Sequence, residues 1–86
     1  MEMEETHLDG NAIGGVLEEA FGREMTDVRG RCEHCGTANL VAALLVYRSG
    51  PGDVVRCPNC MSVVMVAVHL VGGTRIELAG WEQPAA

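Results

Sequence analysis

Four cysteines, arranged as two C-x-x-C pairs, are the residues of this chain best suited to chemistry. They are Cys32 and Cys35 in RCEHCG, and Cys57 and Cys60 in VRCPNC. A C-x-x-C turn directs two sulfur atoms at one point, and two such knuckles together supply the four thiolates that Zn²⁺ binds at ~2.3 Å in a tetrahedral arrangement. The pattern therefore predicts a zinc site with these four cysteines as its ligands.

Two other interpretations of the cysteines stay open. Iron in a rubredoxin-like site uses the same ligands and geometry as zinc. A pair of disulfides or redox dithiols is the other alternative, although such motifs usually accompany a thioredoxin-like βαβ pattern that the sequence lacks. Four sulfur ligands leave no position for water or substrate, and the sequence offers no nucleophile–base pair, so we expect a structural metal and not an enzyme.

The residues around each knuckle raise two further questions. Arg31 and Arg56 precede the first cysteine of their knuckles; they either offset the negative charge of the metal centre or, by strand alternation, point into solvent. Gly36 follows the first knuckle, where a left-handed backbone is common, but Met61 follows the second. We therefore expect Asn59 to adopt the positive φ angle of the second knuckle. His34 is expected to be exposed and not a ligand, because four cysteines already saturate the metal.

Composition and charge narrow the classes of partner. The 86 residues have a net charge of −6, and residues 1–27 carry eight acidic side chains against one arginine. An acidic segment repels phosphate backbones and anionic lipids, so neither nucleic acid nor a membrane is an expected partner. The apolar stretches at 40–47 and 61–71 are shorter than the ~20 residues of a membrane helix. The acidic start MEMEE is unlike a secretory signal, and we expect a cytoplasmic protein with reduced thiols.

The hydrophobic pattern predicts one domain, residues 8–81, between a disordered acidic segment (1–7) and a loose tail (82–86). A helix is expected over about 10–21, with Asp9 as its N-cap and Gly22 as its C-terminal stop. The residues that would share its apolar face are Ile13, Val16, Leu17, Ala20 and Phe21. A ribbon is expected over about 26–80, with strands at 26–32, 40–48, 53–57, 62–71 and 74–80 and turns at 49–52 and 72–73.

Two of these strands are apolar on both faces. Residues 40–47 and 61–71 lack the alternation of a half-buried strand, and one short helix covers only one face of a small sheet. We therefore expect a homodimer, or another protein partner, to cover the second face. His69, inside the second of these strands, is expected to be a hydrogen-bonded core or interface residue.

The chain also resembles a family of small, uncharacterised bacterial zinc-ribbon proteins of unknown function. The resemblance spans nearly the whole chain and rests on HLDGNAIGGVLEEAFG, RCEHCG, the L-V-Y segment with its Pro-Gly turn, VVRCPNC and TRIELAG. In that family glycine usually follows the last cysteine, where this chain has Met61. The resemblance implies a small mainly-β zinc ribbon with one N-terminal helix packed on the sheet and the four cysteines as ligands. It implies no activity.

The function predicted from the sequence is that of a zinc-binding structural and interaction module. A metal–thiolate redox protein, with iron or with a zinc–thiolate switch, is one alternative. A nucleic-acid-binding zinc ribbon is the other, because five arginines lie in the near-neutral part of the chain and a local basic patch can outweigh the net charge.

Overall fold

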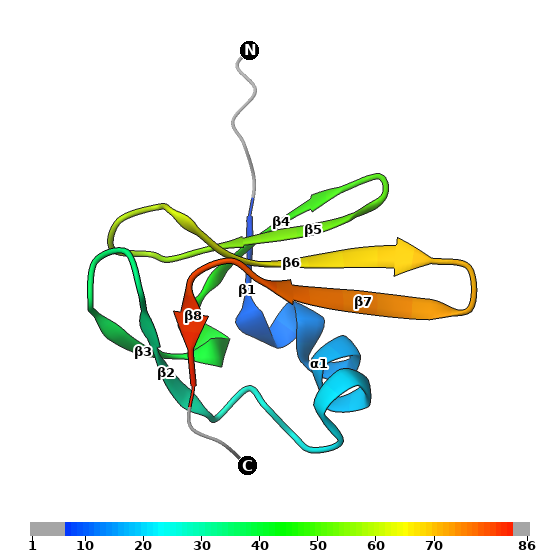
Figure 1. Ribbon diagram of the computed structural model, residues 1–86, viewed down its shortest axis with the longest axis horizontal. Helices are drawn as coiled ribbons and strands as arrows, with labels where there is room; N and C mark the ends of the chain where they lie inside the picture. Colours follow the sequence, from blue (N-terminus) through cyan, green and yellow to red (C-terminus); the bar gives the residue numbers. More distant parts are fainter. Residues whose placement is uncertain (1–6, 84–86) are drawn as a thin grey trace.

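A computed structural model describes residues 7–83 as two antiparallel sheets with a short helical segment (Figure 1). The larger sheet has the strand order β1-β4-β5-β6-β7, and the smaller has the order β3-β2-β8. The strands of the larger sheet are β1 (Leu8–Asp9), β4 (Leu45–Ser49), β5 (Gly52–Arg56), β6 (Val63–Leu70) and β7 (Gly73–Leu78). Those of the smaller sheet are β2 (Arg29–Cys32), β3 (Ala38–Leu40) and β8 (Trp81–Glu82). The predicted mainly-β fold with one N-terminal helix is confirmed.

The helical segment covers the predicted residues 10–21, but only its second part is α-helical. A 3₁₀ helix, η1 (Gly10–Ile13), precedes the α-helix α1 (Gly14–Phe21), because the backbone of Ile13 leaves the helical region at φ −112° and ψ 16°. Asp9 does cap the segment, since its carboxylate accepts the Asn11 N–H at 3.1 Å. Gly22 ends α1 in the left-handed conformation, φ 77°, as predicted.

The core lies between the helical segment and one face of the larger sheet. The inner face is formed by Val46, Val55, Met65 and Ala67, which are paired across β4, β5 and β6 and are almost completely buried. Ile13 and Leu17 pack against this face from η1 and α1. Burial of these side chains explains why a short helix that begins with two glycines is stable here, because packing and not propensity supports it.

The expected strand at 40–48 is not continuous. A 3₁₀ helix, η2 (Val41–Ala43), separates β3 from β4, and the two strands belong to different sheets. Val41 and Leu44 are fully buried as a result, although both lie in the stretch that the sequence assigned to a two-sided strand. The change of sheet therefore buries these two residues within the chain, whereas Leu40 is exposed and Leu45 and Tyr47 are only partly buried.

The expected two-sided strand at 61–71 corresponds to β6, and one of its faces is only half-buried. Cross-strand partners share a face, so Tyr47, Val54 and Val66 lie together on the side away from α1. We define the outer face of the larger sheet by its apolar residues, which are Leu45, Tyr47, Val54, Val66, Val68 and Leu70. The first five are partly buried, and Leu70 is 51 % exposed.

The ends of the described chain form two strands that the sequence did not predict. β1 pairs with β4, and β8 pairs with β2 through Arg31–Glu82 and Cys32–Trp81. Glu82 was expected in a loose tail and instead belongs to a sheet. Residues 1–6 of the expected disordered segment 1–7, and residues 84–86 of the expected tail 82–86, lie outside the described residues. None of the helices in residues 7–83 is long and apolar enough to cross a membrane.

Candidate metal centre

The four cysteine sulfurs lie together where the two sheets meet. Their Sγ atoms are all within 4.8 Å of one another, with Cys32–Cys60 at 3.7 Å and Cys35–Cys57 at 3.8 Å, and no disulfide joins them. A regular tetrahedron with metal–sulfur bonds of ~2.3 Å has edges of about 3.8 Å. The cluster therefore has the size and shape of a four-thiolate metal site.

Each knuckle is the turn of a β-hairpin. The first connects β2 to β3 and the second connects β5 to β6, and the two loops meet at one end of the molecule (Figure 1). In the first, the Gly36 N–H donates to the Cys32 carbonyl at 2.8 Å; in the second, the Met61 N–H donates to the Cys57 carbonyl at 2.8 Å. The turns have the same geometry although their residues differ.

Backbone amides also point at the sulfur of the first cysteine in each knuckle. The His34 N–H donates to the Cys32 sulfur at 3.4 Å, and the Asn59 N–H donates to the Cys57 sulfur at 3.3 Å. Such donors stabilise a thiolate in either the free or the metal-bound form. His34 itself is exposed, and its Nε2 lies 3.1 Å from the Ala79 carbonyl, away from the sulfurs.

Positive φ angles occur at the same place in both turns. Gly36 has φ 80° and Met61 has φ 66°, and Met61 is the one non-glycine residue with positive φ among those described. The expectation that Asn59 would adopt this conformation was wrong. After this residue the chain must turn back so that the next carbonyl, that of Thr37 or Ser62, accepts the first cysteine's N–H at 3.0 Å, and the left-handed conformation makes that turn whatever the residue type.

The two knuckle arginines bind backbone instead of facing the sulfurs or solvent alone. Arg31 Nη1 donates to the Gly36 carbonyl at 2.7 Å, and Arg56 Nη1 donates to the Met61 carbonyl at 2.7 Å. Each arginine thus fastens the left-handed residue of its own turn. Arg56 also lies over the ring of Tyr47, 6.0 Å from its centroid.

Hydroxyl groups two residues after the second cysteines were missed by the sequence analysis. The Thr37 hydroxyl lies 3.4 Å from the Cys35 sulfur, and hydrogen bonds from this hydroxyl and the Thr37 N–H lower the pKa of Cys35 to about 6. Ser62 lowers the pKa of Cys60 in the same way. Burial has the opposite effect on Cys57, raising its pKa to about 11. The signal was present in the sequence as C-x-x-C-x-[ST] in both knuckles.

Trp81 is a second residue that the sequence analysis did not connect with the site. It is 3 % exposed, lies opposite Cys32 in the β2–β8 pairing and belongs to the core cluster that contains Cys32 and Cys57. Gly30 makes room for the indole, because a Cβ there would lie 2.3 Å from a ring carbon. The tryptophan therefore shields one side of the site from water.

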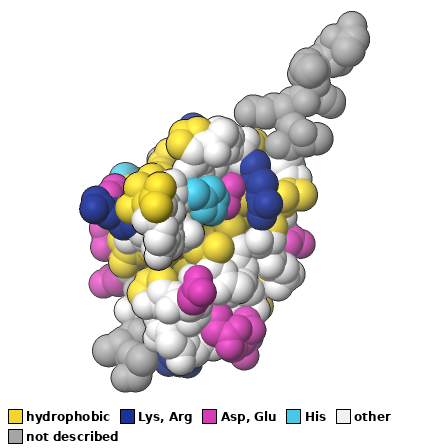
Figure 2. Space-filling model, turned by 90° about the vertical axis from the view of Figure 1, so that its right-hand side faces the viewer, with side chains coloured by type: hydrophobic (Ala, Val, Ile, Leu, Met, Phe, Trp, Pro, Cys, Tyr) yellow, Lys and Arg dark blue, Asp and Glu magenta, His cyan; other side chains and the backbone are white. Residues whose placement is uncertain are grey.

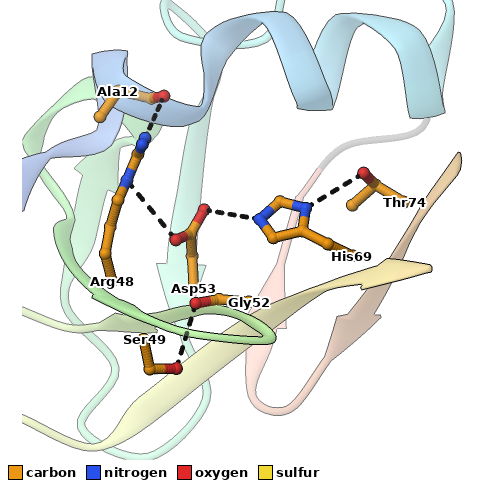
Figure 3. Close-up of polar contacts among 7 residues, drawn as sticks. All are labelled: Ala12, Arg48, Ser49, Gly52, Asp53, His69 and Thr74. Carbon is orange, nitrogen blue, oxygen red and sulfur yellow. Dashed lines mark hydrogen bonds and ion pairs between the residues drawn. The ribbon is translucent and has the colours of Figure 1, made fainter. Parts of the chain in front are cut away.

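A separate polar cluster lies at the opposite end of the larger sheet, by the β4–β5 and β6–β7 turns. Asp53 is 3 % exposed and is bound by Arg48 at 3.5 Å and His69 at 3.7 Å (Figure 3). Arg48 also donates to the Ala12 carbonyl at 3.0 Å, and His69 contacts the Thr74 hydroxyl at 3.3 Å. His69 is hydrogen-bonded as predicted but is exposed instead of buried in a core. The surface here mixes histidine, charged and hydrophobic side chains (Figure 2).

The fold and the cluster define a small mainly-β metal-binding domain built on two C-x-x-C knuckles. The chain belongs to DUF6510, a family of unknown function, whose model matches residues 4–85. Comparison with curated proteins and comparison with solved structures each gave no significant match. Family membership agrees with the resemblance found in the sequence and adds no activity to it.

Proposed function

We propose that this protein is a zinc-stapled scaffold for protein–protein interaction. The observation that carries the proposal is the gathering of four cysteine sulfurs within 4.8 Å of one another. Matched knuckles of this kind are typical of structural zinc sites, and four thiolates fill the tetrahedral coordination of Zn²⁺. Without an open position the metal binds neither water nor substrate, so its role is to hold the two sheets together.

The size of the core supports a stabilising role for the metal. The fully buried side chains of this domain are mostly aliphatic, and Trp81 is the one buried aromatic residue among those described. Small structural zinc sites supply apparent binding free energies of ~10–16 kcal/mol, comparable to the whole stability of a typical domain. Metal binding is therefore expected to decide whether the two sheets stay docked.

The outer face of the larger sheet supports the interaction part of the proposal. Its apolar side chains lie side by side on β4, β5 and β6 and remain partly exposed, while the inner face is buried under η1 and α1. A contiguous apolar surface on a small domain is typical of a site that contacts another protein.

The arginine contacts favour this function over nucleic-acid binding. Four of the six arginines are already engaged by groups of the described chain, either backbone carbonyls or carboxylates. These are Arg31, Arg48, Arg56 and Arg75. A phosphate backbone requires several cations free to replace its counterions, and a chain of net charge −6 supplies few.

Removal of the metal tests the proposal. Purified protein is expected to contain one Zn²⁺ per chain and to unfold cooperatively on heating, and a chelator is expected to abolish that cooperative transition. Thr37→Val is the matched control, since it keeps all four thiolates and should keep the metal at neutral pH. An identical melting curve with and without metal would rule out a staple. Visible absorption bands and bound iron would instead indicate a redox protein.

A further inference from the structure

Strand β7 is an edge strand that is long enough to pair with another chain. It has six residues, whereas the other edge strands in residues 7–83, which are β1, β3 and β8, have two or three. Its register with β6 is continuous, and its sequence GTRIEL contains no proline. Bulges, prolines and short lengths are three of the features that protect a sheet edge, and β7 has none of these three, although it carries two charged side chains.

Alternate residues of β7 direct their backbone groups to the free edge. The Ala79 N–H donates to the Val64 carbonyl at 2.9 Å, and hydrogen-bonded pairs alternate with non-hydrogen-bonded pairs along an antiparallel ladder. Arg75 and Glu77 therefore exchange hydrogen bonds with β6. The residues whose N–H and C=O groups point away from β6 are Thr74, Ile76 and Leu78. These three make no other backbone hydrogen bond within the described chain.

The charges on β7 are arranged so that the strand complements itself. Arg75 and Glu77 lie on the outer face, where Arg75 Nη1 is 3.4 Å from Glu77 Oε2. Their side chains are 63 % and 55 % exposed. When a second, antiparallel β7 places Ile76 opposite Ile76, each Arg75 lies opposite the Glu77 of the other copy. Registers centred on Arg75 or on Glu77 would instead place like charges directly opposite each other, which is unfavourable.

We propose that two copies of this chain associate by antiparallel pairing of β7 with β7, centred on Ile76. The outward backbone groups of Thr74, Ile76 and Leu78 then find partners, and the two Arg75–Glu77 cross-strand pairs are related by the two-fold axis. The two larger sheets become one continuous sheet, and their outer faces join into a single surface. This inference rests on the proposed interaction function and names one partner, a second copy, and the strand that it contacts.

Charge reversal on β7 tests the pairing. The wild type is expected to show a concentration-dependent monomer–dimer equilibrium by sedimentation velocity. Arg75→Glu and Glu77→Arg each place like charges opposite each other and should raise the dimer Kd at least about tenfold. A mixture of these two variants restores opposite charges at both pairs, so it should form a heterodimer. The double variant R75E/E77R should dimerise as the wild type does. Both side chains are exposed, so the folds should be unchanged by circular dichroism.

Val54→Glu distinguishes edge pairing from packing through the outer face, because it puts a charge on the outer face two strands away from the β7 edge. It should leave the dimer Kd within about twofold of the wild-type value, as expected for a site outside the contact. A dimer that Val54→Glu disrupts and Arg75→Glu leaves intact would overturn edge pairing in favour of face-to-face packing. A zinc-loaded wild type that is monomeric at all concentrations would also overturn it, while the zinc-stapled scaffold would stand. Absence of stoichiometric zinc would refute that scaffold, whatever the oligomeric state.

Discussion

The two knuckles have the same hydrogen-bond geometry but different residues and surroundings. Both carry an arginine before the first cysteine and a hydroxyl residue two positions after the second. The first knuckle belongs to the small sheet, has Gly36 at its left-handed position and leaves Cys35 exposed. The second belongs to the larger sheet and has Met61 at that position. The comparison shows that the site depends on backbone geometry, which the first knuckle adopts with less strain than the second.

Serine substitution of a buried ligand and of an exposed ligand should differ most in the loss of metal and of folding. Cys57 is fully buried and Cys35 is exposed, so Cys57→Ser leaves a polar group in the core as well as removing a ligand. We expect Cys57→Ser to lose both the metal and cooperative folding, and Cys35→Ser to keep a weakly metal-bound folded state. Metal content and thermal unfolding would measure the difference. Full metal content in Cys57→Ser would contradict the four-thiolate site.

Substitutions at the two left-handed positions should change the stability of the protein in opposite directions. A non-glycine residue in this conformation costs ~1–2 kcal/mol, although glycine has more entropy to lose on folding. Gly36→Ala should therefore destabilise the protein by about 1 kcal/mol, and Met61→Gly should stabilise it by about 0.5–1 kcal/mol. The Met61 residue is 43 % exposed, so only part of its side chain has packing contacts to lose. Equal melting temperatures for Met61→Gly and the wild type would show that the second knuckle is not strained.

The hydroxyl residues should set the pH at which metal is released. Hydrogen bonds from Thr37 hold the pKa of Cys35 near 6, below its ordinary value of 9.0, so this thiolate persists above about pH 6 and is lost as the pH falls through that value. Thr37→Val raises the pKa of Cys35, and protons then compete with the metal at higher pH. We expect the pH at which half of the metal is released to be higher in Thr37→Val than in the wild type, and to be higher in Ser62→Ala as well. A zinc-binding dye across pH 4–8 would measure it; an unchanged midpoint would exclude the hydroxyl effect.

Substitution of the knuckle arginines should change stability by amounts comparable to those at the left-handed positions. Arg31→Gln and Arg56→Gln each remove one side-chain hydrogen bond to an exposed turn carbonyl, which is worth about 0.5–1.5 kcal/mol. Arg56→Gln should cost slightly more, because Arg56 also lies over the Tyr47 ring. Urea unfolding of the zinc-loaded variants would rank them. A larger loss of stability in Arg31→Gln than in Arg56→Gln would mean that the contact of Arg56 with the Tyr47 ring adds nothing to stability.

Local features of this fold were predictable from the sequence, and distant pairings were not. The C-x-x-C spacing, the Asp9 cap and the Gly22 stop act within a few residues, and all three are present in the structure. The pairing of β8 with β2 and the packing of Trp81 beside Cys32 join residues far apart in the chain, which no local pattern records.

The break of the 40–48 segment was missed for a related reason. An apolar run fits a two-sided strand as well as it fits two strands in different sheets. The η2 turn between β3 and β4 is decided by where the chain must pass from the knuckle sheet to the larger sheet. Sequence periodicity gives the burial of Val41 and Leu44 but not the sheet that each segment joins.

X-ray absorption spectroscopy of protein purified without added metal tests the central claim most directly. It identifies the bound element and counts its ligands in one measurement. The account predicts zinc with four sulfur neighbours at ~2.3 Å and no oxygen or nitrogen neighbour. Fewer than four sulfurs, or a nitrogen or oxygen ligand at ~2.0–2.1 Å, would contradict a closed four-cysteine site.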